Sequence, residues 1–362
     1  MKVLENKFVS MSAQDLLDAA GPAAGQQISG SADVVTSYEK DLATFFGKRH
    51  AITVSSGTVA LYCAMRAVGL GPGDEILLPP TAVSMCGLPA LLLGASVRFA
   101  DITPQLGFGL DPAAVEASLT PKTRAVMSVP LWGYPVPMRD LAELCRKRGV
   151  VLIEDVSQSH GTTSDGQLLG TFGDVACFST HERKLITTGE GGFVLTDANA
   201  IAEAVQVFKR YGSNDALGLN FKLSALSAAF GRTQVKKLPT KIAARAKVAD
   251  ALREALRGLD WVEEIPVPSG STQNFYTLVF RLLDGKLSVK KLDRHLADQK
   301  ILTDTFRYGF RPLFEYPLFK AGAKNCPNAE QLIGQVFTLP CHEGMDASDV
   351  QRVAQAMRDF VA

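Results

Sequence analysis

Ser55-Ser56-Gly57-Thr58 is the first of three segments whose residue types could take part in chemistry. The segment stands between a short apolar run and an apolar stretch with the spacing of a helix. Free backbone N–H groups and the dipole at the start of a helix attract phosphate, and hydroxyl side chains add donors. Serine and threonine are also ordinary helix N-caps. Taken alone, the segment therefore fits both a phosphate site and a plain helix start.

An acidic pair forms the second segment. Glu154 and Asp155 follow the apolar run 150–153. In α/β proteins ligands bind beyond the carboxyl ends of parallel strands, so an acid at this place can contact a ligand. An acid here also fits a helix cap or a salt bridge in a loop.

The third segment contains a lysine, Lys184, five residues after Ser179, followed by the glycine-rich turn 187–192. A lysine amine forms a Schiff base with a carbonyl cofactor when its surroundings lower its pKa. Arg183 beside it disfavours the protonated amine, Ser179 can donate to a phosphate, and glycines let the backbone approach a ligand. Most lysines, however, are only surface charges.

The order of these segments is that of a pyridoxal-phosphate (PLP) site. Asp155 would keep the pyridine nitrogen protonated, so that the ring serves as an electron sink, and Lys184 would hold the aldehyde. The glycines of residues 69–73 follow a helical segment instead of a strand, and no GKS or GKT occurs. A dinucleotide fingerprint and a P-loop are therefore excluded, and with the fingerprint an NAD-dependent dehydrogenase.

The elements that must position these residues alternate between strands and helices up to about residue 173. This alternation predicts an α/β fold with a mostly parallel central sheet sandwiched by helices. A helix is expected to end before Pro239, and a second helix to cover 243–257. We predict a large domain over residues 1–235 and a smaller α+β C-terminal domain over 236–362. The expected strands are 50–54, 75–78, 96–100, 125–129, 150–154, 175–178 and 192–196, and the expected helices of this part include 37–46, 59–68, 85–93, 112–117 and 138–148.

Composition narrows the function further. The chain has 362 residues, with 38 Lys+Arg and 37 Asp+Glu. It therefore lacks the basic excess that binding to nucleic acid without sequence preference requires. The locally basic segment 232–257 is expected to be a solvated helix face. Six cysteines without a CxxC pair do not indicate a metal site. We expect a cytoplasmic protein, because no secretory signal and no apolar run near the roughly 20 residues of a membrane helix is present.

Several longer motifs resemble those of the DegT/DnrJ/StrS sugar aminotransferase family, which has the aspartate aminotransferase fold. The resemblance extends over nearly the whole chain, from about Val35 to the C-terminal helix. The matching stretches are Ser55-Ser56-Gly57-Thr58 with Ala60-Leu61, Gly71-Pro72-Gly73-Asp74-Glu75, Ile153-Glu154-Asp155 with Gln158 and His160-Gly161, Phe178-Ser179 with Lys184 and Thr188-Gly189-Glu190-Gly191-Gly192, and Asn220-Phe221-Lys222-Leu223-Ser224.

The resemblance implies a role for each matching position. Lys184 corresponds to the Schiff-base lysine that later moves the proton, and Asp155 to the partner of the pyridine nitrogen. Asn220 corresponds to a residue that reaches the phosphate from the other subunit, which implies a homodimer with shared active sites. The remaining cofactor positions are Ser56, Gly57, Thr58 and Ser179 at the phosphate, Gln158 near the cofactor hydroxyl, and Val83 against the ring.

The chain departs from the family at the ring-stacking position, where Val83 replaces an aromatic residue, and at Asn274, where a histidine is frequent. The family activity would be amino transfer from glutamate or glutamine to a keto-sugar, in first place a nucleotide-linked one. A keto-cyclitol or another antibiotic precursor is the alternative. The candidates for substrate contacts are His181, Arg183, Arg307 and Tyr308, whereas His342 is expected to be structural.

Lys184 and Asp155 disfavour two other functions of proteins with this fold. Sugar dehydratases of the family replace the lysine by histidine, but Lys184 is present. A regulator without catalytic activity would be expected to lose Lys184 or Asp155, and the chain keeps both.

Overall fold

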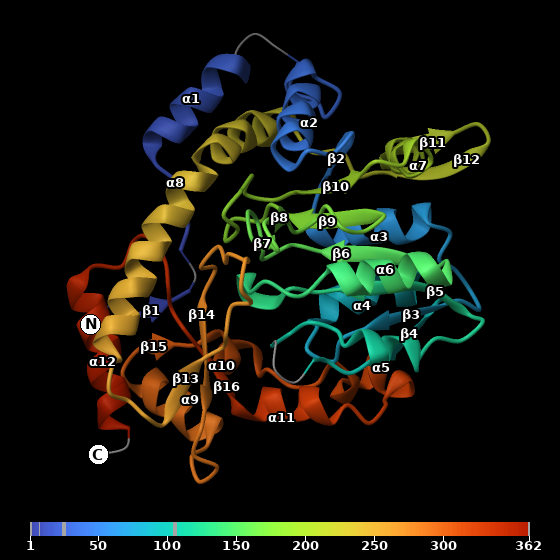
Figure 1. Ribbon diagram of the computed structural model, residues 1–362. Coiled ribbons are helices and arrows are strands. Elements are labelled where there is room, and N and C mark those ends of the chain that lie inside the picture. Colours follow the sequence, from blue (N-terminus) through green and yellow to red (C-terminus); the bar gives the residue numbers. More distant parts are fainter. Residues whose placement is uncertain (1, 7, 24–26, 104–106, 361–362) are drawn as a thin grey trace.

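A seven-stranded sheet forms the centre of the protein. The computed structural model describes residues 2–6, 8–23, 27–103 and 107–360 (Figure 1). The sheet has the strand order β2-β10-β9-β6-β5-β3-β4, and β10 runs in the direction opposite to that of the other six strands. The strands are β2 (His50–Val54), β3 (Glu75–Leu78), β4 (Ser96–Phe99), β5 (Thr123–Ser128), β6 (Val151–Asp155), β9 (Val175–Ser179) and β10 (Gly192–Thr196).

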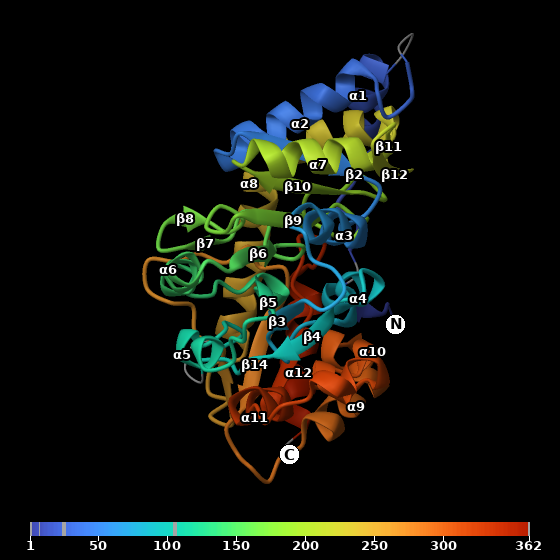
Figure 2. The same cartoon turned by 90° about the vertical axis from the view of Figure 1, so that its right-hand side faces the viewer.

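Helices cover both faces of this sheet. Figure 2 shows α3 (Gly57–Ala67) and α4 (Ser84–Leu92) on one side of the strands, and α5 (Pro112–Glu116) and α6 (Arg139–Arg148) on the other. The strands between them are buried on both faces, as parallel strands require. The predicted α/β fold with a mostly parallel central sheet is confirmed.

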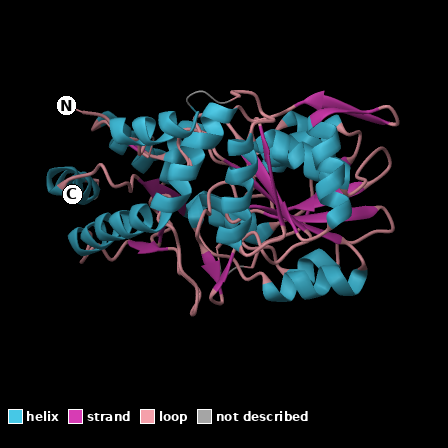
Figure 3. Cartoon of the chain, turned by 90° about the horizontal axis from the view of Figure 1, so that it is seen from above, coloured by secondary structure: helices cyan, strands magenta, loops and turns pink. Residues whose placement is uncertain are grey.

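The C-terminal part lies beside the sheet (Figure 3). It has a hydrophobic core of its own. Its strands form a three-stranded antiparallel sheet in the order β13-β14-β16. Phe280, Phe337 and Val353 belong to this second core. The elements are β13 (Val262–Glu264), β14 (Leu278–Leu282), α9 (Val289–Asp298), α10 (Asp304–Tyr308), α11 (Pro327–Gln335), β16 (Val336–Leu339) and α12 (Ala347–Asp359).

One long helix, α8 (Ala225–Ala255), connects the two parts (Figure 1). The prediction of two helices separated at Pro239 is wrong, because α8 continues through this residue. An interior proline costs about 3 kcal/mol through the lost hydrogen bond and the ring clash. Burial on both sides of it, by Leu238 in the first core and Leu252 in the second, offsets this cost. The division of the chain at 235/236 therefore falls inside a helix, and it stays a prediction.

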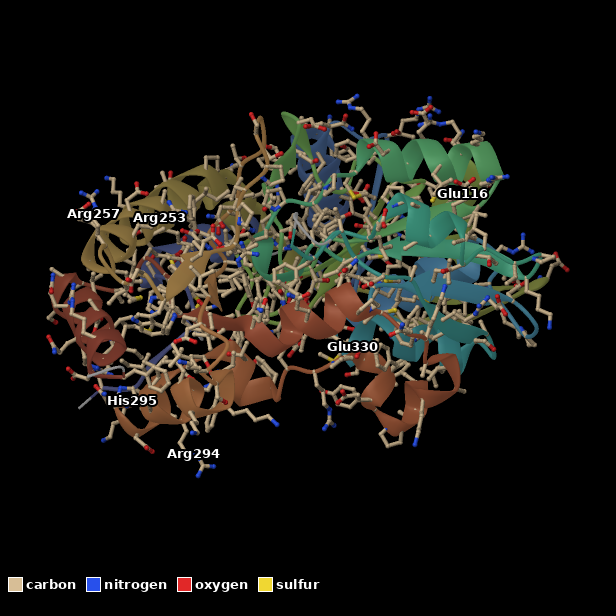
Figure 4. The ribbon with its side chains drawn as sticks, turned by 60° about the horizontal axis from the view of Figure 1, so that its bottom comes forward. Glu116, Arg253, Arg257, Arg294, His295 and Glu330 are labelled. Atoms are coloured by element: carbon tan, nitrogen blue, oxygen red, sulfur yellow. The ribbon has the colours of Figure 1, made fainter. Side chains whose placement is uncertain are left out.

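The basic segment 232–257 is not a solvated face throughout. Lys241 and Arg245 are buried, at 7% and 3% exposure, so the prediction is wrong for these two residues. Arg253 and Arg257 do lie at the surface of α8 (Figure 4), where they pair with Glu264 and Glu254. Part of the positive charge of this helix is thus buried in the protein, and part is paired with carboxylates at its surface.

A two-stranded hairpin projects from the large part beside α7 (Asn199–Lys209) (Figures 1 and 2). It consists of β11 (Arg210–Ser213) and β12 (Ala216–Asn220), which the sequence did not predict. The remaining elements are β1 (Leu4–Glu5), which pairs in parallel with β15 (Ile301–Leu302), α1 (Ala13–Ala23), α2 (Asp33–Phe46), β7 (Thr163–Ser164), β8 (Gln167–Leu168) and the 3₁₀ turns η1 (Leu131–Gly133), η2 (Leu313–Glu315) and η3 (Pro317–Gly322). Within the described residues, no helix has the length and apolar character needed to cross a membrane.

Candidate active site

The carboxyl ends of three strands bring the predicted residues together. Gly192 at the start of β10 pairs with Val54 of β2 on one side and with Ser179 of β9 on the other. Asp155 at the end of β6 lies opposite Cys177 of β9. The segments that are far apart in sequence therefore meet at one edge of the sheet, where α/β proteins bind their ligands.

A cradle for an anion forms where α3 begins. Ser56 caps the helix, its hydroxyl accepting from the Val59 N–H at 3.2 Å. Gly57 lies so close to Ser179 that a Cβ at residue 57 would be 2.6 Å from the Ser179 Cβ. Together with Thr58, these residues line the same cavity. Backbone N–H groups at a helix start and two hydroxyls are a donor set that fits a phosphate.

Asp155 faces this cavity, whereas Glu154 beside it does not. Asp155 is 7% exposed; its Oδ1 accepts from the Ser157 N–H and its Oδ2 from the Cys86 thiol, both at 3.1 Å. Because side chains alternate along a strand, Glu154 points to the opposite face. There it accepts three backbone N–H bonds from residues 170–173, so its role is to hold that loop.

Lys184 enters the cavity from the loop after β9. Desolvation by burial lowers the pKa of its amine, although the negative charges of Asp155 and Asp304 oppose this shift. The Nζ atom lies 5.1 Å from the centre of the Tyr276 ring. A lysine with a lowered pKa holds more of its amine in the nucleophilic form.

The loop that carries Lys184 is fixed from two sides. The Lys241 Nζ donates to the Leu185 carbonyl at 2.9 Å, and the Ile186 N–H donates to His160 Nδ1 at 3.1 Å. His160 is 1% exposed, and desolvation lowers its pKa to about 3, so the ring is neutral. The buried lysine of α8 and the neutral histidine thus hold Lys184 in position.

The cavity has a volume of about 430 Å³, which is within the range of ligand pockets, roughly 300–1,000 Å³. The sheet edge forms one part of its wall, and α10 with the residues after it forms another. The predicted residues that line it are Ser56, Gly57, Thr58, Val83, Asp155, Gln158, Ser179, His181, Arg183, Lys184, Arg307 and Tyr308.

Asn220 is the predicted site residue that does not line this cavity. It ends the exposed hairpin, and its side-chain oxygen accepts from the Lys222 amine at 2.7 Å. The expectation that it serves the site of a second subunit stays a prediction.

The candidates for substrate contacts come from both parts of the cavity wall. Arg183 donates to the Tyr308 hydroxyl at 2.7 Å, which bridges the lysine loop and α10. The His181 Nε2 lies 3.7 Å from a carboxylate oxygen of Glu190. Arg307 forms an ion pair with Glu5. Arg183 and Arg307 thus already have internal partners, whatever they contact in a ligand.

Aromatic residues that the sequence did not single out line the cavity near Val83. Trp132 has a left-handed backbone with a φ of 56°, and its N–H donates to Gln158 Oε1 at 2.6 Å. Its ring packs edge-on against Phe310 at 4.7 Å. Tyr276 and Tyr316 add further aromatic surface. Trp132 lies in the short segment after β5, where no pattern distinguishes it from a core residue.

Asp304 is a second carboxylate in the cavity that sequence reasoning missed. It is 8% exposed and lies at the start of α10. An aspartate just after a threonine N-cap is common in the first turn of a helix, so no sequence pattern places it beside Lys184.

Fold and site together define an α/β enzyme in which a lysine and a buried carboxylate face one cavity beside an anion cradle. The sequence matches the model of the DegT/DnrJ/EryC1/StrS aminotransferase family over residues 12–358, and the chain belongs to this family. It is therefore an aminotransferase, and the resemblance inferred from its motifs is confirmed.

Three similar proteins illustrate the range of the family. A GDP-perosamine synthase of Caulobacter vibrioides is 30% identical over 339 residues, 91% of either chain. The structure of S. venezuelae DesV in complex with a ketimine intermediate has a TM-score of 0.89 at 26% identity and covers 99% of both chains. The structure of a 3-amino-5-hydroxybenzoic acid synthase has a TM-score of 0.87 at 26% identity, again with 99% of both chains covered.

Proposed function

We propose that this protein is a PLP-dependent aminotransferase that moves an amino group from glutamate or glutamine to a keto-sugar, in first place a nucleotide-linked one. The single observation that carries the proposal is the placement of Lys184 and Asp155 in one cavity beside the anion cradle of α3. The alternative acceptor is a keto-cyclitol or another antibiotic precursor.

The residues present fit this cofactor. Gly57 lets the start of α3 approach Ser179 closely, so that the backbone N–H groups of the helix start and the Ser179 hydroxyl can serve one phosphate. Asp155 offers a buried carboxylate to the pyridine nitrogen, and Lys184 offers an amine to the aldehyde. When bound, PLP supplies an electron sink that stabilises negative charge on the carbon next to the amine.

Lys184 is also the residue placed to move protons. With its amine free, Nζ takes the proton from the carbon that bears the donor's amino group and later returns one to the carbon that is aminated. Positioned acid–base help of this kind is worth about 10²–10⁴-fold in rate. The Tyr276 ring lies 5.1 Å from this amine and contributes an aromatic surface beside it.

The sugar assignment is supported by the relatives, and the alternative has support as well. GDP-perosamine synthase, by its name, makes a nucleotide-linked amino sugar. The hydroxybenzoic acid synthase, by its name, makes an aromatic amine that is not a sugar. A sugar dehydratase is disfavoured, because Lys184 stands at the position where such enzymes carry histidine.

We further propose a cytoplasmic homodimer in which the hairpin of β11 and β12 lies against the partner. The hairpin exposes Tyr211, Leu217 and Leu219 at 65%, 81% and 53%. Asn220 at its end would then reach the cavity of the partner subunit. A two-stranded ribbon of this kind is only marginally stable unless it packs on something else.

Spectroscopy of the purified protein tests the cofactor assignment. PLP added to the protein should give a visible absorption band, and Lys184→Ala should abolish it. A protein that stays colourless after reconstitution would disprove the assignment. Glutamate or glutamine should then bleach the band, and a panel of keto-sugars and keto-cyclitols should restore it, the fastest of them indicating the acceptor class.

A further inference from the structure

Asp304, the first residue of α10, lines the cavity. Its backbone is fixed, because the Asp304 N–H donates to the Thr338 hydroxyl at 2.7 Å. Its side chain has one hydrogen bond from a described residue, a long one of 3.4 Å from the Asn6 amide. The side chain is therefore held in place but has little of the donor set that a buried carboxylate requires.

No cation of the described residues lies within 4 Å of Asp304. The positive charges of Lys184 and Arg183 act on it from farther away, and burial raises its pKa to about 6. A buried carboxylate costs several kcal/mol unless hydrogen bonds or an ion pair compensate it. At neutral pH the Asp304 carboxylate is thus a charged hydrogen-bond acceptor in the cavity, available to a ligand.

We propose that Asp304 is a specificity-determining residue that accepts a hydrogen bond from a ring hydroxyl of the keto acceptor. This inference rests on the proposed function. It assigns the acceptor to the polyhydroxylated class, and it places one of its hydroxyls toward α10.

The cofactor is not the partner of Asp304. The groups that would hold its phosphate and its ring nitrogen, Ser179 and Asp155, belong to the sheet wall. The amino donor is not the partner either, because the carboxylate of Asp304 repels the carboxylates of glutamate. An ammonium group on the acceptor is disfavoured by Lys184, Arg183 and Arg311, which face the same space. An uncharged hydroxyl can donate a hydrogen bond to Asp304 without being repelled by the carboxylate or by these cations.

The experiment separates the two half-reactions in wild type, Asp304→Ala and Asp304→Asn. The donor half-reaction is followed as bleaching of the visible band by glutamate or glutamine. The acceptor half-reaction is followed as its return with the keto-sugar that is fastest for the wild type. A hydrogen bond to a charged group is worth about 1.5–3 kcal/mol, or roughly 10–150-fold. Asp304→Ala should lower kcat/KM for the acceptor by this factor and change the donor half-reaction by less than about threefold.

Deoxy analogues and a binding measurement identify the contact directly. For one analogue of the acceptor that lacks a single ring hydroxyl, the wild type should show a lower kcat/KM than for the complete acceptor. Asp304→Ala should show the same kcat/KM for this analogue and for the complete acceptor. GDP-mannose and dTDP-glucose carry hydroxyls but no keto group. Calorimetry identifies which of the two binds the wild type, and this ligand should bind Asp304→Ala about tenfold more weakly. Equal losses in both half-reactions would overturn the inference, because Asp304 would then act through Lys184.

Asp293 provides the matched control. It is also a buried carboxylate, at 5% exposure, and lies next to α10, but it accepts from the hydroxyls of Thr303 and Thr305 and does not line the cavity. Asp293→Asn should leave acceptor specificity unchanged; the same loss in this variant would assign the effect to distortion of α10. If the wild type aminates no keto-sugar or keto-cyclitol, the proposed function fails too; if it does and Asp304→Ala is unaffected, this inference alone fails.

Discussion

Gly57 at the start of α3 and Ser179 at the end of β9 lie so close together that a methyl group on residue 57 would be 2.6 Å from the Ser179 Cβ. The requirement is one of space, since the backbone of Gly57 is helical and would itself accept alanine. The contact brings the first residue of α3 and the last residue of β9 to one point, and this point is the proposed phosphate site.

Gly57→Ala should therefore weaken cofactor binding more than it weakens the fold. Overpacking costs about 1–3 kcal/mol, which corresponds to roughly 5–150-fold in the dissociation constant of PLP if the methyl displaces Ser179 from the cradle. Titration of the apoprotein with PLP measures this constant. Gly71→Ala is the control, because a Cβ at Gly71 meets nothing within 4 Å; similar losses in both variants would contradict the assignment.

The cysteines should be unreactive in the native protein although one of them touches the site. All six are buried, and burial together with the charge of Asp155 raises the pKa of the Cys86 thiol well above its usual value. Since the thiolate is the reactive species, a disulfide reagent such as DTNB should label no cysteine quickly in the folded protein and six after denaturation. Rapid labelling of one native cysteine would show that a buried site opens.

The sheet and the core of the site could be predicted from sequence because both are encoded locally. A buried parallel strand is a short apolar run, and the residues that follow it must lie at one edge of the sheet. Ser179 stands directly after such a run, and Asp155 and Gly57 stand within three positions of the end of theirs, so the meeting of their segments followed from the topology.

The parts that could not be predicted depend on contacts between distant segments. The passage of α8 through Pro239 is stabilised by two cores, and neither is visible in the helix sequence. Lys241 resembles a surface residue until its contact with the Leu185 carbonyl is known. Asp304 lies 120 positions after Lys184, and only the docking of α10 onto the cavity brings the two together.

Asp304 should make stability depend on pH with a defined sign. Burial raises its pKa from 3.8 to about 6, so the native state binds the proton more tightly than the unfolded chain. Stability from this group is then highest below about pH 4 and falls as the pH rises to about 6. At about 1.4 kcal/mol per pKa unit, the loss is up to about 3 kcal/mol.

Asp304→Asn removes this titration. Urea unfolding should show the variant more stable than the wild type by up to about 3 kcal/mol at pH 8, with the difference disappearing at pH 4. A variant that is less stable at pH 8 would mean that an internal donor already satisfies the carboxylate, which would also count against its proposed role in binding a substrate hydroxyl.

The hairpin should be needed for assembly rather than for folding. Leu217 is 81% exposed near its tip. The ribbon contacts α7, and the Lys222 Nζ lies 3.9 Å over the Tyr211 ring, so Leu217 is left available to a partner. If the hairpin packs on a partner, Leu217→Asp places a charge in an apolar contact and should shift sedimentation from dimer to monomer. Because Asn220 would then no longer reach the partner's cavity, PLP affinity should fall as well. Leu283→Asp changes another exposed leucine and should do neither; a wild type that sediments as a monomer, with full PLP affinity, would contradict the shared site.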